Sequence, residues 1–239
     1  MLTQRRLNKE AYVIILAGGL ASRLGKLTKF KPKSLIKINK KPFIILQLKK
    51  LEKLGFKNVI LCLSHFSDKI IKEISKYKFN LNINFSFDGN TQLGTGGAIK
   101  NALKQKCSSY FFVVYGDVLF NLNLKKILNN FKIKQKKIDS LMVIFKSKSH
   151  YEKGNVLICE NGLIKYDKFN TKDNMDFIDY GVSIFKKKTI LSEKKKRFDL
   201  SIVQKKLSKK KKLIGYISKT RSYEIGSKLG IKQINNYKG

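Results

Sequence analysis

The chain of 239 residues contains no tryptophan, only two prolines and only three cysteines. The cysteines, Cys62, Cys107 and Cys159, are odd in number and lack the Cys-x-x-Cys spacing, which argues against a disulfide scaffold and a structural zinc site. Long apolar runs are missing too. The run at residues 11–17 is too short to span a membrane, and the glycines and charges after it do not resemble a secretory cleavage site. We therefore expect a soluble, cytoplasmic protein with no membrane partner.

Acidic residues are scarce as well. The chain has 52 Lys and Arg against 16 Asp and Glu, a formal net charge of +36. Such a balance can indicate a polyanion partner, such as nucleic acid or an anionic membrane. However, only five of the basic residues are arginines, which pair with phosphate and guanine in one plane, and the lysines are spread over the whole length. We interpret the charge as a solvated surface and expect no specific nucleic-acid partner.

Strand and helix patterns alternate along the first half of the chain. This order predicts an α/β sandwich with a mostly parallel sheet. The short apolar runs typical of buried strands are residues 12–16, 59–63 and 110–114, and residues 81–87 alternate as a strand with one exposed face. Segments with the apolar spacing of helices are residues 43–54, 67–77, 98–106 and 124–131.

After residue 140 the predicted strands come closer together. We expect strands at residues 141–145, 181–185 and 213–217, a hairpin around residues 160–162, and helices at residues 200–207 and at the C-terminal end. The chain shows no linker rich in Pro, Gly or Ser and no internal repeat. The simplest prediction is one domain over residues 1–239, with a second half rich in β-structure.

Two glycine-rich segments follow predicted strands, at the edge where open α/β sheets bind ligands. In residues 16–33, adjacent glycines follow a strand, and Arg23 and Lys33 could neutralise a phosphate chain. This segment is neither a Walker loop nor a dinucleotide fingerprint, and its glycines alone favour an ordinary strand-to-helix turn. In residues 92–98, three glycines near a helix start could admit a base or phosphate, although a helix entry explains them equally well.

Two acidic segments follow strands in the same way. Asp117 comes after the most apolar strand and a glycine, a usual position for a Mg²⁺ ligand because this ion prefers a carboxylate, phosphate oxygens and water. Glu224, in residues 223–226, could bring a second carboxylate to the same edge. A solvated turn remains a fair alternative for Glu224.

Together these segments resemble the sugar-1-phosphate nucleotidyltransferases, or NDP-sugar pyrophosphorylases. The family signature LAGGxGTRL followed by PKP is similar to LAGGLASRL and Pro32-Lys33-Ser34 in this chain. The family's LGTGGA motif stands at residues 93–98, its GD motif at residues 116–117 and its [DE]IG[ST] motif at residues 224–227. Residues 154–156, 166–168 and 178–182 resemble the sugar-side motifs. The likeness runs from about residue 13 to residue 231, and the branch that it resembles most is the D-glycero-D-manno-heptose 1-phosphate guanylyltransferase-like group.

The resemblance implies Mg²⁺-dependent nucleotidyl transfer from a nucleoside triphosphate to a sugar 1-phosphate, with GTP and a heptose or hexose 1-phosphate as candidate substrates. It implies a three-layer, Rossmann-like mixed sheet of the nucleotide-diphospho-sugar transferase type, with a nucleotide-binding half at 1–135 and a sugar-binding half at 136–239. The implied catalytic residues are Arg23, Lys33 and Asp117, and the implied metal ligands are Asp117 and Glu224. The implied substrate contacts are Leu16, Gly18, Gly19, Gly94, Thr95, Gly96, Gly97, Asn155, Lys168 and Gly181.

Other readings remain open. A phosphocholine-type cytidylyltransferase shares the fold and signature but needs an aromatic cage for quaternary ammonium, and the sequence shows no clear aromatic cluster near the sugar-side motifs. A basic nucleic-acid-binding protein would interleave aromatic and basic residues on one face. An inactive homologue is a third reading, because Ala21 and Ser22 replace the usual Gly-Thr. The sequence names neither the base nor the sugar, and it leaves the oligomeric state open.

Overall fold

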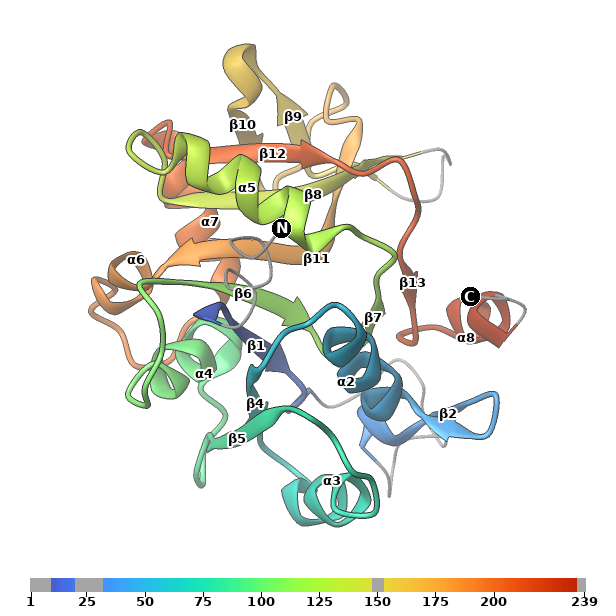
Figure 1. Cartoon of the computed structure of the whole chain (residues 1–239). Coiled ribbons are helices and arrows are strands. Elements are labelled where there is room, and N and C mark those ends of the chain that lie inside the picture. Colours follow the sequence, from blue (N-terminus) through green and yellow to red (C-terminus); the bar gives the residue numbers. More distant parts are fainter. Residues whose placement is uncertain (1–9, 20–31, 148–152, 236–239) are drawn as a thin grey trace.

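The structure is a computed structural model that describes residues 10–19, 32–147 and 153–235. Within these residues the main sheet has nine strands, and helices cover both of its faces (Figure 1). Four strands of the first half are parallel and lie in the order β5-β4-β1-β6, as the alternating pattern predicted. These strands are β1 (Tyr12–Leu16), β4 (Asn58–Leu63), β5 (Asn82–Phe87) and β6 (Tyr110–Tyr115).

The second half extends the same sheet. Strand β11 lies antiparallel beside β6, β8 is antiparallel to β11, and β12 is parallel to β8. A hairpin of β9 and β10 pairs with the start of β11. The sheet is therefore mixed, as predicted. The bounds are β8 (Ser140–Lys146), β9 (Val156–Ile158), the 3-10 turn η3 (Glu160–Gly162), β10 (Ile164–Tyr166), β11 (Phe177–Lys186) and β12 (Leu213–Ile217).

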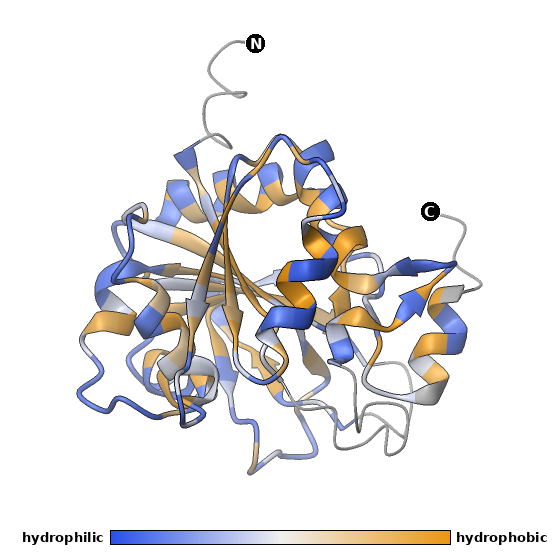
Figure 2. Ribbon diagram, turned by 90° about the horizontal axis from the view of Figure 1, so that it is seen from below, coloured by the Kyte–Doolittle hydropathy of each residue, from blue (hydrophilic) through white to orange (hydrophobic). Residues whose placement is uncertain are grey.

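Side chains alternate between the two faces of each strand, and this alternation explains the three layers, in which helices pack on both faces of the sheet. In β1, Val13 and Ile15 join one hydrophobic core, and Ile14 joins the core on the opposite face. The apolar stripes of α2, α3 and α5 close the first core, and those of α4, α6 and α7 close the second, with apolar residues concentrated toward the sheet (Figure 2). The helices are α2 (Phe43–Lys53), α3 (Ser67–Ile74), α4 (Gly94–Ala102), α5 (Leu124–Lys134), α6 (Lys187–Leu191) and α7 (Leu200–Lys209).

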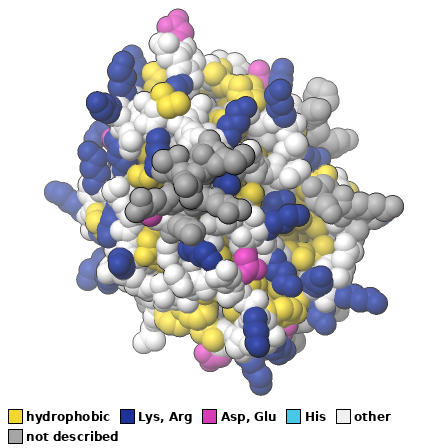
Figure 3. Space-filling view, in the orientation of Figure 1, with side chains coloured by type: hydrophobic (Ala, Val, Ile, Leu, Met, Phe, Trp, Pro, Cys, Tyr) yellow, Lys and Arg dark blue, Asp and Glu magenta, His cyan; other side chains and the backbone are white. Residues whose placement is uncertain are grey.

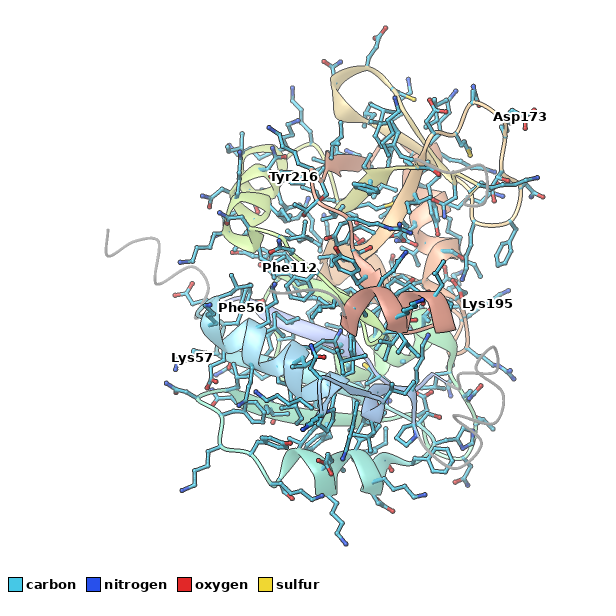
Figure 4. The ribbon with its side chains drawn as sticks, turned by 90° about the vertical axis from the view of Figure 1, so that its right-hand side faces the viewer. Phe56, Lys57, Phe112, Asp173, Lys195 and Tyr216 are labelled. Carbon is cyan, nitrogen blue, oxygen red and sulfur yellow. The ribbon has the colours of Figure 1, made fainter. Side chains whose placement is uncertain are left out.

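Aromatic packing fixes α2 and the chain that follows it on the first face. Phe56 comes directly after Gly55, which ends the helix with a φ of 82°, a conformation that glycine adopts without strain. The ring of Phe56 meets that of Phe112 on β6 edge to face, with 5.5 Å between centroids, and both residues are buried (Figure 4). This contact holds the chain that follows α2 against β6.

Several short elements lie at one edge of the sheet, and of these only the C-terminal helix was predicted. Strands β7 and β13 pair with each other beside the end of β6, and the C-terminal helix α8 lies next to β13 (Figure 1). A small core of Ile38, Phe43, Ile225 and Ile234 holds these elements together. They are η2 (Lys33–Leu35), β2 (Lys37–Ile38), β3 (Lys41–Pro42), β7 (Val118–Leu119), β13 (Tyr223–Glu224) and α8 (Lys228–Asn235).

The surface shows the same excess of basic over acidic residues as the composition of the chain. Lysine and arginine side chains are scattered over the face shown in Figure 3, with isolated acidic residues between them. Among the described residues, no helix combines the length and the apolar composition that a membrane span requires.

Candidate active site

A first cavity opens where β1, β4, β5 and β6 end, the edge at which open parallel sheets bind ligands. Its volume of about 360 Å³ lies in the range of small-molecule sites. The structure brings three separately predicted segments to its wall, since residues following β1, preceding and opening α4, and following β6 all contribute. The predicted residues on this wall are Leu16, Gly18, Gly19, Lys33, Gly94, Thr95 and Asp117.

Gly96 and Gly97 pack against a distant segment of the chain. Neither residue is on the cavity wall, and both backbone N–H groups donate to the carbonyl oxygen of Phe198, at 3.0 and 3.2 Å. A Cβ on Gly96 would lie 2.2 Å from the Phe198 ring, and one on Gly97 would lie 2.4 Å from the carbonyl oxygen of Lys196. Both glycines therefore let a distant segment pack against the start of α4, and their contact with a substrate stays a prediction. That packing also explains why α4 begins at Gly94 rather than at residue 98.

An ion pair lies on the wall of this cavity. Lys33 belongs to the 3-10 helix η2, and Asp117 lies in the turn between β6 and β7. The Lys33 Nζ donates to Asp117 Oδ2 at 2.6 Å, and the two side chains are 17% and 33% exposed. Both charges are thus partly removed from water while they remain accessible from the cavity.

Glu224 approaches the same pair from β13. Because β13 pairs with β7, the Ile225 N–H donates to the carbonyl oxygen of Asp117 at 3.0 Å. The Glu224 carboxylate accepts hydrogen bonds from the Gly226 N–H and, at 2.7 Å, from the Ser227 hydroxyl. A Cβ on Gly226 would lie 2.8 Å from Lys33 Nζ and would also overlap the Glu224 carboxylate. The missing side chain therefore leaves a space bordered by the ammonium group and this carboxylate.

The two carboxylates fit a hard divalent cation that takes its other ligands from phosphate and water. Such an ion uses one or two protein carboxylates in nucleotide sites. The described residues contain no group of three or more His, Cys, Asp or Glu side chains that could hold a metal alone. Each oxygen of Glu224 has a second lone pair beyond its hydrogen bond, so the carboxylate keeps acceptor capacity.

The second cavity lies beside the first, and Tyr115 lines both. Its wall is formed by residues in the first half of β11, directly before β9, at and after the end of β10, and around β13 and α8. The structure therefore joins the predicted sugar-side residues to the predicted metal ligand on β13. The predicted residues on this wall are Asn155, Lys168, Gly181 and Glu224.

Asp179 is a member of the second cavity that sequence reasoning missed. Its N–H donates to the side-chain oxygen of Asn155 at 3.0 Å, and its Oδ1 accepts from the Gly181 N–H at 2.9 Å. Burial raises the pKa of Asp179 to about 6, against the opposing effect of the hydrogen bonds from Gly181 and Gln204 and of the Lys168 charge. Gly181 has a φ of 84°, and the pairing of β11 with β8 shifts register here. No periodic pattern signals such a bulge, which is why Asp179 was not predicted.

Asp88 is the corresponding omission in the first cavity. It follows β5 in the way that Asp117 follows β6, so the rule that found Asp117 would also have found it. Its Oδ2 accepts from the Leu93 N–H at 3.2 Å. Burial raises the pKa of Asp88, with Leu93 and His65 acting in the opposite direction.

Lys168 and Thr95 make contacts within the protein. The Lys168 ammonium forms an ion pair with Asp199 at 3.0 Å, and the Thr95 hydroxyl accepts from the Leu200 N–H at 2.8 Å. Arg23 and the altered pair Ala21 and Ser22 lie outside the described residues, so their predicted roles are not tested by the structure.

Comparison with known proteins agrees with this arrangement. The "Nucleotidyl transferase" family model matches residues 12–223. A D-glycero-alpha-D-manno-heptose 1-phosphate guanylyltransferase from Campylobacter jejuni is 42% identical over 122 residues, covering 50% of this chain and 54% of the relative. A mannose-1-phosphate guanyltransferase from Yarrowia lipolytica is 28% identical over 162 residues, covering 66% of this chain and 44% of the relative. The chain thus spans about half the length of these curated relatives.

A solved structure covers more of the fold. HddC from Yersinia pseudotuberculosis, in a complex with GMP-PN, superposes with a TM-score of 0.79 and 28% identity, covering 94% of this chain and 98% of that chain. The predicted fold class is confirmed by this neighbour, and the predicted resemblance is confirmed by the family match. The chain belongs to the nucleotidyl transferase family.

Proposed function

We propose that the chain transfers the nucleotidyl group of a nucleoside triphosphate to a sugar 1-phosphate and releases pyrophosphate. The observation that carries this proposal is the meeting of two cavities at Tyr115, one lined by the predicted nucleotide-side residues and the other by the predicted sugar-side residues. The charged groups of Lys33, Asp117 and Glu224 gather where the cavities meet. A triphosphate in the first cavity and a sugar phosphate in the second would therefore react at these charges.

The reaction needs no protein nucleophile. A phosphate oxygen of the sugar 1-phosphate attacks the α-phosphorus in line, a new P–O bond forms, and the bond to the bridging oxygen of pyrophosphate breaks. The attacking oxygen already carries negative charge near neutral pH, so no base has to remove a proton. Catalysis then rests on positioning and charge neutralisation. Lys33 is the residue that we assign to the α-phosphate and the incoming sugar phosphate.

We assign Asp117 and Glu224 to a divalent metal ion, with Mg²⁺ as the expected ion. Enzymes of this family generally use a divalent metal. When bound, such an ion neutralises charge on the phosphate oxygens and on the departing pyrophosphate. Holding the triphosphate is assigned to the backbone at Gly18 and Gly19, together with Arg23.

GTP is our proposed nucleotide. The relatives named above are guanylyltransferases by name, which supports this choice. Asp88 supports it independently, because a carboxylate can accept from both the N1–H and the N2–H groups of guanine. One Asp88 oxygen accepts from Leu93, and its other oxygen has no hydrogen-bond partner among the described residues. We place the base beside Gly94 and Thr95, near this carboxylate.

For the acceptor we propose a heptose or hexose 1-phosphate, bound by Asn155, Lys168 and Gly181 in the second cavity. Three tyrosines, Tyr115, Tyr166 and Tyr180, also line this cavity, an aromatic grouping that the sequence pattern did not reveal. Lys168 and Arg221 are on the same wall, and their charges suit a phosphorylated sugar better than a trimethylammonium group.

Neither alternative finds support in the relatives named above. On the face drawn in Figure 3 the lysine and arginine side chains are scattered rather than gathered into the basic patch that a nucleic-acid-binding protein would present.

The test is pyrophosphate release by the purified protein with Mg²⁺. Four nucleoside triphosphates are arrayed against several sugar 1-phosphates, including a heptose 1-phosphate, and against phosphocholine. We expect release that requires GTP together with one sugar 1-phosphate. Release with CTP and phosphocholine would replace the proposed acceptor, and silence from folded protein across the whole array would refute the proposed activity.

A further inference from the structure

Gln47 is a buried polar residue next to the turn that carries Asp117. It lies on α2, and no part of it is exposed to solvent. Its Nε2 donates two hydrogen bonds, to the carbonyl oxygen of Tyr115 at 3.0 Å and to that of Val118 at 2.8 Å. These two carbonyls flank Gly116 and Asp117, so one amide group holds both ends of the turn (Figure 1 shows α2 beside β6 and β7).

The same helix is tied to the segment of Lys33. The N–H of Phe43, the first residue of α2, donates to the carbonyl oxygen of Ile36 at 2.9 Å, and Ile36 directly follows the 3-10 helix η2 that begins with Lys33. Gln47 therefore stands between the backbone that presents Lys33 and the backbone that presents Asp117. The Lys33 Nζ and Asp117 Oδ2 atoms of these two backbone segments are 2.6 Å apart.

The unpaired oxygen of Gln47 shows that this side chain is not simply filling space. Among the described residues its Oε1 is one of the few buried polar side-chain atoms with no hydrogen-bond partner. A buried unpaired acceptor is unfavourable, and a leucine would fill a similar volume without one. What glutamine adds, and leucine cannot, is the pair of N–H donors to the turn.

We propose that Gln47 is a positioning residue, which fixes the Asp117 carboxylate relative to Lys33 so that the metal ion and the α-phosphate meet in reactive geometry. This inference rests on the proposed nucleotidyl transfer. Gln47 itself touches neither substrate nor metal. Loss of its donors would let the turn move while the other parts of the two cavity walls stay in place.

The test compares Gln47→Leu with Gln105→Leu. Gln105 also donates its side-chain amide to a backbone carbonyl, that of Phe85 at 2.8 Å, but it lies away from the Asp117 turn. For Gln47→Leu we expect kcat to fall about ten- to a hundredfold, because a small displacement at a reacting centre has effects of that size. KM for the nucleotide should change less than about threefold, and Mn²⁺ affinity, measured by paramagnetic resonance with the nucleotide present, should weaken. Gln105→Leu should keep wild-type kcat and Mn²⁺ affinity.

A second variant distinguishes the loss of the hydrogen-bond donors from a general loss of folding. In Gln47→Glu, a protonated carboxyl can still donate one hydrogen bond to the turn, whereas an ionised one repels both carbonyls. Its activity relative to wild type should therefore fall as pH rises. The proposal is overturned if Gln47→Leu lowers only the melting temperature, or if both leucine variants lose kcat equally. Should the wild type transfer no nucleotide at all, the proposed function fails, while the Mn²⁺ titrations of the variants still decide the role of Gln47.

Discussion

Lys33 and Asp117 are separated by 84 positions in the chain, yet they form a 2.6 Å ion pair. Because both side chains are partly buried, their attraction is less screened than that of an exposed surface pair. Phosphate oxygens would offer Lys33 a competing anion, and a metal ion would compete for Asp117. The pair is therefore suited to exchange partners when substrates arrive, with little movement of the backbone.

Replacing Asp117 by asparagine tests the metal assignment. We expect Asp117→Asn to lose metal-dependent turnover by at least about a hundredfold, since the amide cannot neutralise a divalent ion. Its melting temperature should stay close to that of wild type. Asp139→Asn is the matched control, because Asp139 forms a similar 2.8 Å ion pair with Lys186 away from the cavities. Pyrophosphate release at increasing Mg²⁺ provides the measurement, and near-normal turnover by Asp117→Asn would remove this residue from the metal site.

Asp179 predicts a pH dependence of stability. Its pKa of about 6 lies above that of an unfolded aspartate, so the folded state binds the extra proton and stability declines as pH rises from about 4 to about 6. At pH 8 the buried charge costs up to about 3 kcal/mol. Asp179→Asn should therefore unfold at a higher temperature than wild type at pH 8, with an advantage that shrinks toward pH 4.5. Thermal unfolding across this pH range tests the prediction. A gain in melting temperature that does not depend on pH would contradict the raised pKa of Asp179.

At the scale of elements, the start of α4 depends on a segment that follows it by a hundred residues. Glycines and a threonine are weak helix formers, and residues 94–97 would not begin a helix by propensity alone. The carbonyl of Phe198 and the packing of its ring supply what propensity does not. The sequence pattern had only local information, so it placed the helix start four residues too late.

This packing predicts coupling between Gly96 and Phe198. Gly96→Ala should destabilise the fold by about 1–3 kcal/mol, because its methyl group would overlap the Phe198 ring. Phe198→Leu makes room for that methyl group. The double variant should therefore lose less stability than the sum of the two single variants. Urea denaturation of the four proteins measures the difference, and strict additivity would show that the ring yields without cost.

Two signals in the sequence account for what could be predicted. One is the spacing of apolar residues, and the other is the position of a residue directly after a strand. The runs that became β1, β4 and β6 are continuous and bounded by turns, and they were placed within a residue or so. Strands β7 and β13 have two residues each and exist only because they pair with each other, which no local pattern reveals. For the same reason the sequence could place Asp117, Glu224 and Lys33 at one edge of the sheet but could not show which of these side chains meet.

At the scale of the whole molecule, the excess of positive charge acts on stability. A net charge of +36 places many lysines close to one another, and their mutual repulsion disfavours the compact state. Salt screens this repulsion, since the screening length falls to about 3 Å at 1 M. The few acidic residues limit the number of favourable pairs that salt would weaken.

We therefore expect added KCl to stabilise the protein. The melting temperature should rise between about 0.05 M and about 0.5 M KCl, the range in which screening lengths become shorter than lysine spacings. Differential scanning fluorimetry in KCl is sufficient, with sucrose as the control for effects that do not depend on charge. A lower melting temperature at high salt would mean that ion pairs such as Lys205–Asp167 outweigh the repulsion.

The carbonyl of Phe198 also bears on how the two halves, 1–135 and 136–239, could be exchanged between enzymes. A chimera that joined this first half to another sugar-binding half would replace the segment whose Phe198 carbonyl accepts from the Gly96 and Gly97 amides, whose Phe198 ring packs on Gly96, and whose Leu200 N–H donates to the Thr95 hydroxyl. The proposed boundary between the nucleotide-binding and sugar-binding halves is therefore not a boundary of packing. A graft meant to change the sugar must carry residues 196–200 with the nucleotide side, although they follow the junction by about sixty positions.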